Sequence, residues 1–150
     1  MGIGAVMDAL VVIQGNLTTS HSDVSEIARA WKFIPPGNAG LPELPAFMNT
    51  FSFTGEQRNI GQRKLFYTIE MRLYVGDADS EQDHRAEQLI QFHEQFIDDL
   101  DDDVSLTNQI TTMERRGSDP TLVVIDHGGK GFLAIVEFMD IVITEAKSFS

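Results

Sequence analysis

The residues that first suggest chemistry form an acidic run at positions 98–103, DDLDDD. Carboxylates at alternate positions are the ligands that a calcium-binding loop supplies. Counted from Asp99, however, the position that needs glycine holds Val104, and the position that needs a bidentate carboxylate holds Ile110. The run therefore favours the acidic end of a helix over a calcium site, and we predict no metal.

A second candidate is the run GGKGF at positions 128–132, which resembles a phosphate-binding loop in composition. It lacks the spacing of such a loop, and Lys130 is not followed by Ser or Thr. It also lies between two predicted strands, whereas a phosphate loop precedes a helix. The adjacent Gly128 and Gly129 are instead typical of a two-residue hairpin turn.

Nucleophiles and bases form no catalytic arrangement. No serine stands in a Gly-x-Ser-x-Gly elbow, and the chain has no cysteine. The histidines are scattered: His21, His84, His93 and His127. Glu137 and Asp140 are three residues apart in a predicted strand, so they should face opposite sides of a sheet and cannot share a proton. We assign no catalytic residue and no cofactor, and we predict that the protein is not an enzyme.

The net charge of the 150 residues is −12, and one segment carries most of the excess. Residues 77–103 hold 11 acidic residues against Arg85 alone, a net of −10, which leaves 12 acidic and 10 basic residues elsewhere. Binding of nucleic acid by counterion release needs clustered Lys and Arg, so this composition argues against it. The segment is typical of a solvated face, and it could also stand beside DNA as a repelling wall.

Length and composition favour one domain that needs no disulfide, in a reducing or redox-indifferent setting. The apolar residues 3–13 could suggest a signal sequence, but they lack a positively charged leader and Asp8 interrupts them. No run approaches the length of a membrane span. We expect synthesis in the cytosol and a soluble product.

The longest regular pattern is RKLFYTIEMRLYV at positions 63–75, where apolar and polar side chains alternate. This alternation predicts one long antiparallel strand with one buried face. Before it, apolar residues at helical spacing predict a helix over residues 3–15 that ends near Gly15. Residues 24–31 are compatible with a helical turn or an extended segment. Prolines and glycines predict an irregular arm over residues 34–45.

Residues 46–53, AFMNTFSF, predict a strand, and the polar residues 54–62, TGEQRNIGQ, predict a long hairpin loop that joins it to the long strand. A projecting loop of this kind either contacts a partner or simply tolerates insertion. Asp79 and Ser80 then offer a cap for a helix whose apolar stripe runs from Ala86 to Leu100. His93 lies on that stripe, so we predict a hydrogen-bonded core residue there.

Three extended segments follow, at residues 105–116, 121–127 and 132–144. The last of these, FLAIVEFMDIVIT, is apolar on both faces for most of its length. We therefore predict that it is central in the sheet, with a helix on one side and another layer or subunit on the other.

This order of elements resembles the bacteriophage tail terminator and tail completion proteins, small virion components at the junction of tail and head. Three features carry the resemblance over most of the chain. They are LPAF at residues 44–47, which leads into the first long strand, the alternating LFYTIEMRLYVG at residues 65–76 just before a helix, and a final strand close to the C-terminus.

The resemblance implies a single tail-terminator-like domain over residues 1–150. Its implied fold is α+β, with a mixed or antiparallel sheet of about four to five strands and a long looped hairpin, flanked by the N-terminal helix and the central acidic amphipathic helix. Such domains assemble into a ring, with six copies implied here, that caps the tail tube and joins it to the head. The implied partners are other copies of the chain, the tail tube protein and a head-completion or connector protein. Genomic DNA would pass through the lumen without sequence-specific binding, and no membrane is involved. The implied location is the virion, after synthesis in the host bacterial cytoplasm.

Two sets of residues are candidates for function in such a ring. The candidate subunit or ring interface consists of Arg58, Asn59, Arg63, Lys64, Arg115 and Arg116. The candidate acidic face, toward either the lumen or a partner, consists of Asp98, Asp99, Asp101, Asp102 and Asp103. The sequence leaves open whether this acidic face lines the channel or the outside.

Two other functions stay open. A tail tube subunit or another head-to-tail connector subunit shares the hairpin and helix pattern, but a tube subunit would polymerise into long tubes where a terminator stops at one ring. A small-molecule-binding or enzymatic α+β domain would need a deep pocket with convergent polar groups.

Overall fold

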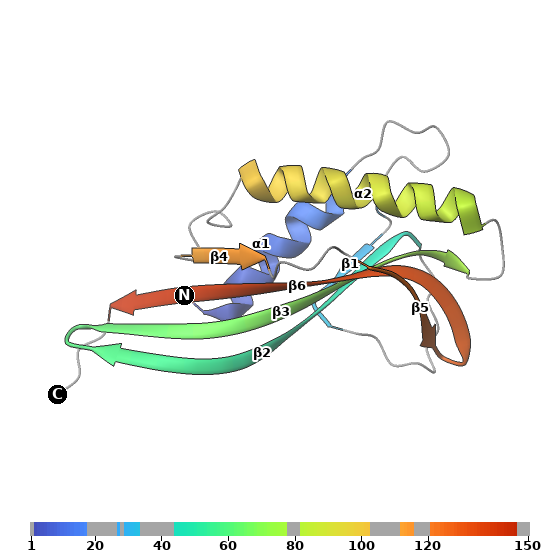
Figure 1. The fold of residues 1–150 in the computed structure, drawn as a ribbon. Helices are drawn as coiled ribbons and strands as arrows, with labels where there is room; N and C mark the ends of the chain where they lie inside the picture. The colour runs from blue at the N-terminus through green and yellow to red at the C-terminus, as the bar shows by residue number, and fades with distance from the viewer. Residues whose placement is uncertain are drawn as a thin grey trace.

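A computed structural model describes residues 2–17, 27, 29–33, 44–77, 82–102, 112–115 and 121–146. Its elements in chain order are α1 (Ile3–Gly15), β1 (Arg29–Trp31), β2 (Ala46–Asn59), β3 (Gln62–Asp77), α2 (Gln82–Asp102), β4 (Thr112–Arg115), β5 (Thr121–His127) and β6 (Lys130–Ala146). The chain is α+β, as predicted, with two helices packed on a sheet (Figure 1).

The sheet is mixed. Five strands follow one another as hydrogen-bonded neighbours in the order β1-β2-β3-β6-β4, and β5 pairs with β6 off this path. β1 runs parallel to β2, and the remaining described pairs are antiparallel. β6 pairs with β3 along one edge and with β4 and β5 along the other. The prediction that the final strand is central is therefore confirmed.

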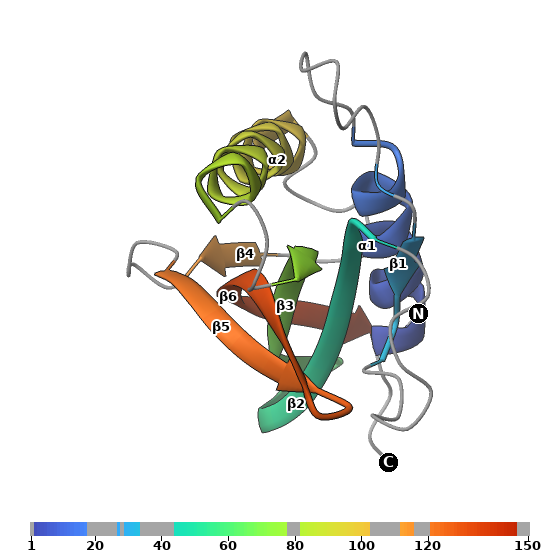
Figure 2. The same ribbon diagram turned by 90° about the vertical axis from the view of Figure 1, so that its right-hand side faces the viewer.

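Both helices cover the same face of the sheet, here called the helix face (Figures 1 and 2). α1 has the predicted bounds, and its buried side chains Val6, Met7 and Leu10 recur at helical spacing. α2 contributes buried residues of the same periodicity: Leu89, Phe92, Phe96 and Leu100. These side chains meet the inward-pointing residues of β3 and β6 in one apolar core. The predicted cap of this helix, Asp79 and Ser80, lies outside the described residues.

The opposite face of the sheet, here called the open face, has a small core of its own at one end. Met48, Tyr74, Phe132 and Ala134 are buried there, and Trp31, Leu44 and Ile125 pack against them. The β5–β6 hairpin bends across this end of the open face (Figure 2). This bend explains part of the two-sided apolar pattern of β6, because the chain itself supplies the second layer at this end.

The prediction of a loop over residues 54–62 is wrong. β2 continues to Asn59 and β3 starts at Gln62, so only Ile60 and Gly61 turn the chain. Gly61 has a φ of 75°, which favours glycine. The sequence resembles a loop because most side chains of this stretch are exposed, so no alternation between a buried and an exposed face marks the strands. A register shift between Phe53 and Gly55 interrupts the alternation further.

Four further expectations concern shorter segments. Residues 29–31 are extended and form β1. The arm over residues 34–45 lies outside the described residues except for Leu44 and Pro45, which are joined by a cis peptide bond. Of the segment 105–116, residues 112–115 are described, and they form β4. The glycine pair Gly128–Gly129 makes the predicted hairpin turn between β5 and β6, with φ values of 66° and 83°.

Candidate functional site

The β2–β3 hairpin reaches past the helices and ends in the turn at Ile60 and Gly61 (Figure 1). We call residues 56–65 the hairpin tip. The strands pair Arg58 with Arg63, and β3 in turn pairs Arg63 with Glu145 near the end of β6. The hairpin register therefore sets two arginines next to each other on the helix face, where they would repel if neither had an acidic neighbour.

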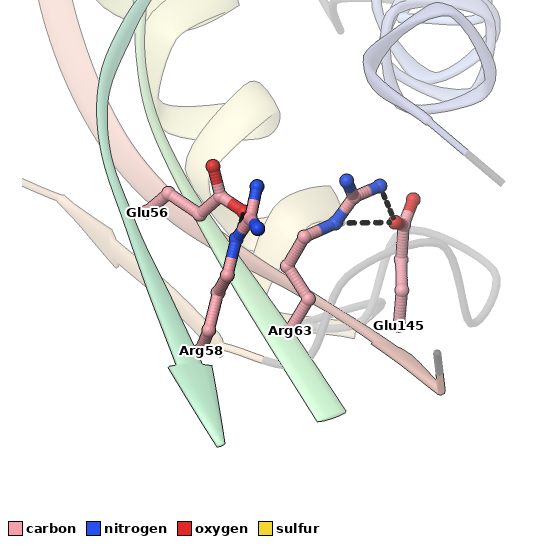
Figure 3. Close-up of polar contacts among 4 residues, drawn as sticks. All are labelled: Glu56, Arg58, Arg63 and Glu145. Carbon is pink, nitrogen blue, oxygen red and sulfur yellow. Dashed lines mark hydrogen bonds and ion pairs between the residues drawn. The ribbon is translucent and has the colours of Figure 1, made fainter. Parts of the chain in front are cut away.

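Each arginine has a carboxylate partner (Figure 3). Arg58 Nε donates to Glu56 Oε1 at 2.6 Å, and the Arg58 side chain is 62% exposed. Arg63 donates from Nε to Glu145 Oε2 at 3.1 Å, and its Nη2 contacts the same oxygen. The hydrogen bond with Glu145 is the main cause that raises the pKa of Arg63 above its ordinary value. The four side chains form a charge row across three strands.

Lys64 and Asn59 lie on the other face. Side chains alternate along a strand, so Lys64 points away from Arg63 and faces the open side together with its partner Gln57. Asn59, exposed beside the turn, also lies on that side because it pairs with Gln62. The four hairpin residues predicted as one interface are thus divided, with Arg58 and Arg63 on the helix face and Asn59 and Lys64 on the open face.

An aromatic patch adjoins the charge row on the helix face, and the candidate residues named from sequence did not include it. The rings of Phe51 and Phe53 lie 6.1 and 5.4 Å from the ring of Tyr67. Phe51 is 47% exposed and Phe53 is 55% exposed. We call Phe51, Phe53 and Tyr67 the aromatic patch. The sequence pattern that could have revealed this patch is the alternation of Phe47, Phe51 and Phe53 along β2. This alternation places the three rings on one face of the sheet, but it does not show where α1 stops covering that face.

The candidate acidic residues lie on α2 and its exit. Asp98 and Asp101 are exposed, and Asp99 is partly buried and accepts a hydrogen bond from Gln95 at 2.9 Å. Asp102 ends the helix, and Asp103 lies outside the described residues. Asp98 and Asp101 continue an outward stripe that also contains Glu87, Ile90 and Glu94. We call these five residues the α2 stripe. In the described part of the chain, no group of three or more His, Asp or Glu side chains is arranged to hold a metal ion.

Of the two remaining candidates, Arg115 belongs to the other edge of the sheet. Arg115 is the last residue of β4 and pairs with Met139 of β6. Arg116 lies outside the described residues. Since β4 and the outer side of β2 are at opposite edges, the structure does not bring Arg115 together with the hairpin arginines.

Two other ionisable side chains, His93 and Arg72, have structural partners. His93 Nε2 and Glu137 Oε2 are 2.8 Å apart and tie α2 to β6, so the prediction of a hydrogen-bonded core histidine is confirmed. On the open face, Arg72 donates to Glu70 at 2.7 Å and to the Tyr74 hydroxyl at 3.4 Å. Burial by itself would lower the pKa of Arg72, but the hydrogen bonds with Tyr74 and Glu70 outweigh it and raise the pKa.

Glu137 and Asp140 point to opposite faces of the sheet, as predicted, because Glu137 meets His93 of α2 whereas Asp140 accepts a hydrogen bond from Thr68 on the open face. No described helix is both long enough and apolar enough to cross a membrane.

No protein-family model matches the chain, and no curated protein matches it at a significant level.

Proposed function

We propose that the protein is a structural subunit of a phage virion that forms a ring at the junction of tail and head. In this proposal the ring caps the tail tube, contacts the tail tube protein on one side and a head-completion or connector protein on the other, and lets genomic DNA pass through its lumen. Six copies per ring follow from the resemblance to tail terminator proteins.

The observation that carries the proposal is the β2–β3 hairpin. It places two half-exposed phenylalanines and the fully exposed Ile60 on a protruding element. Protruding apolar groups rimmed by charge are typical of protein–protein contacts. A protein whose role is assembly needs such a surface and needs no catalytic residue. The sequence suggested no catalytic residue.

In this proposal the long hairpin and the acidic amphipathic helix α2 both take part in the ring. The hairpin supplies contacts to neighbouring copies or to the adjoining ring, with Arg58 and Arg63 as charged members. Those acidic residues of α2 that face the lumen discourage DNA from sticking, because phosphates are repelled at short range and screened beyond about 8 Å at physiological salt. Virion location and synthesis in the host cytoplasm belong to the same proposal.

The test is the mass of the purified protein in solution, measured by light scattering across a concentration series with negative-stain images of the same samples. The proposal expects discrete rings of about six subunits, or monomers that form rings only when tail tubes are added. Open-ended tubes would indicate a tail tube subunit instead. A monomer that ignores tail components would favour a binding or enzymatic domain.

A further inference from the structure

The aromatic patch is a sheet surface that the described helices leave half exposed. α1 ties to β2 at Asn49, where Gln14 donates to it, but Phe51 and Phe53 lie further toward the hairpin tip. Glu56 and Arg58 continue the same face beyond the patch. The surface therefore has an apolar centre and, at one end, the Glu56–Arg58 ion pair, in which the Arg58 side chain is the more exposed, at 62% against 27%.

The α2 stripe has the complementary chemistry. Ile90 is 52% exposed and stands between Glu87 and Glu94, three and four residues away on the same helix side. Asp98 follows one turn later and is also exposed. The stripe is thus an apolar centre with carboxylates at both ends.

The spacing of the two surfaces agrees. Phe53 and Arg58 are five residues apart in β2, but the register shift after Phe53 sets them opposite Tyr67 and Arg63, four residues apart in β3, which corresponds to about 13 Å. Ile90 and Asp98 are eight residues apart in a helix, which corresponds to about 12 Å. The length of the Arg58 side chain covers the difference, so one helix can set Ile90 on Phe53 and Asp98 beside Arg58.

We propose that the α2 stripe of a second copy of this chain docks on the aromatic patch, with Ile90 against Phe51 and Phe53 and with Asp98 and Glu94 facing Arg58. This inference rests on the proposed ring and names its subunit contact. Two copies that met through their α2 stripes would oppose carboxylate to carboxylate, and like charges held together in an interface repel. A head-to-tail contact between the stripe and the patch avoids that repulsion, and such a contact closes into a ring when the rotation allows.

A disulfide test reports the contact directly, because the natural chain has no cysteine. Chains with Phe53→Cys and chains with Ile90→Cys are purified separately, mixed and oxidised, and the cross-linked product is identified by mass spectrometry. Since each chain has a single thiol, a 53–90 disulfide can form only between two copies. Val124→Cys, 59% exposed and located on β5, replaces Ile90→Cys in the control mixture.

Charge reversal gives an independent test. Arg58→Glu should raise the concentration needed for assembly by about tenfold or more, and Asp98→Arg in the same chain should restore it. Lys130→Glu makes a similar charge reversal at an exposed position of the β5–β6 hairpin, away from the patch, so it should leave assembly as in the natural protein. Ile90→Asp should weaken assembly without altering the hairpin, which covers the case in which Arg58→Glu distorts the tip.

The outcomes separate this inference from the proposed function. A 53–90 disulfide that is absent from the Val124→Cys control, together with rescue of Arg58→Glu by Asp98→Arg, is the expected result. Rings in the micrographs without a 53–90 disulfide would overturn the docking of α2 and leave the proposed function standing. If neither rings nor a 53–90 disulfide formed when tail tubes were present, both the docking of α2 and the proposed function would be overturned.

Discussion

Gln14 of α1 and Asn49 of β2 hold each other through two reciprocal amide hydrogen bonds. Gln14 Nε2 donates to Asn49 Oδ1 at 2.8 Å, and Asn49 Nδ2 donates to Gln14 Oε1 at 2.7 Å. Both side chains are fully buried. Asn49 Nδ2 also donates to the Trp31 carbonyl at 2.8 Å. One side chain thus joins α1, β1 and β2, and it does so just before β2 leaves the cover of the helix.

Removal of Asn49 should therefore be costly. Asn49→Ala leaves the buried amide of Gln14 and the Trp31 carbonyl without these partners, and an unsatisfied buried group costs about 1–3 kcal/mol. We expect a loss of about 2–4 kcal/mol in the free energy of unfolding, measured by urea denaturation. The double variant Gln14→Met with Asn49→Ala should lose less than the sum of the single losses. Additive losses would contradict a coupled pair.

A second buried polar contact joins α2 to the sheet. The side chains of His93 and Glu137 are only 16% and 11% exposed and lie among apolar residues that include Phe47 and Phe96. Glu137→Leu should cost about 1–3 kcal/mol, because the histidine nitrogen then lacks its partner in apolar surroundings. Glu137→Gln keeps a hydrogen-bonding group and should cost less, which urea denaturation of the two variants can compare. Equal costs would mean that packing, not the hydrogen bond, sets the contribution.

The sequence predicted those elements whose pattern is set by burial on one face. The helix over residues 3–15 was predicted with its bounds, because α1 presents one apolar stripe to the core. The hairpin turn at Gly128 and Gly129 was predicted because positive φ values demand glycine. His93 was predicted as a core residue because it shares the predicted apolar stripe with Leu89 and Phe96.

The errors fall where burial does not dictate the residues. Residues 54–62 are mostly exposed on both faces, so their polar character suggested a loop although they belong to two strands and a short turn. The contact of Arg63 with Glu145 depends on a register between residues 82 positions apart, and local spacing carries no information about it. The division of Arg58 and Asn59 between two faces follows only once β2 is known to extend to Asn59.

Gly61 tests the short turn at the hairpin tip, and Gly4 of α1 serves as its control. Gly61 has a φ of 75° with no atom within 4 Å of an added Cβ, so Gly61→Ala should destabilise the protein by about 1–2 kcal/mol through backbone strain alone. Gly4 lies in α1 and is equally open, so Gly4→Ala should stabilise by about 0.5–1 kcal/mol. Thermal unfolding of both variants measures the two effects with the same chemical change. A stabilising Gly61→Ala would show that the tip does not adopt this turn.

Tyr74 tests whether the small core on the open face stands without a neighbouring subunit. It is fully buried against Phe132, with ring centres 6.1 Å apart, and its hydroxyl contacts Arg72. Truncation of a large buried aromatic side chain costs about 3–5 kcal/mol, so Tyr74→Ala should lose that amount in the monomer, whereas Tyr74→Phe keeps the ring and should lose about 1 kcal/mol. Urea denaturation of both variants, at a protein concentration low enough to prevent assembly, measures the two losses. If Tyr74→Ala lost stability only in the assembled state, the open face would depend on a neighbour for its cover, and the bend of the β5–β6 hairpin would not be sufficient to bury it.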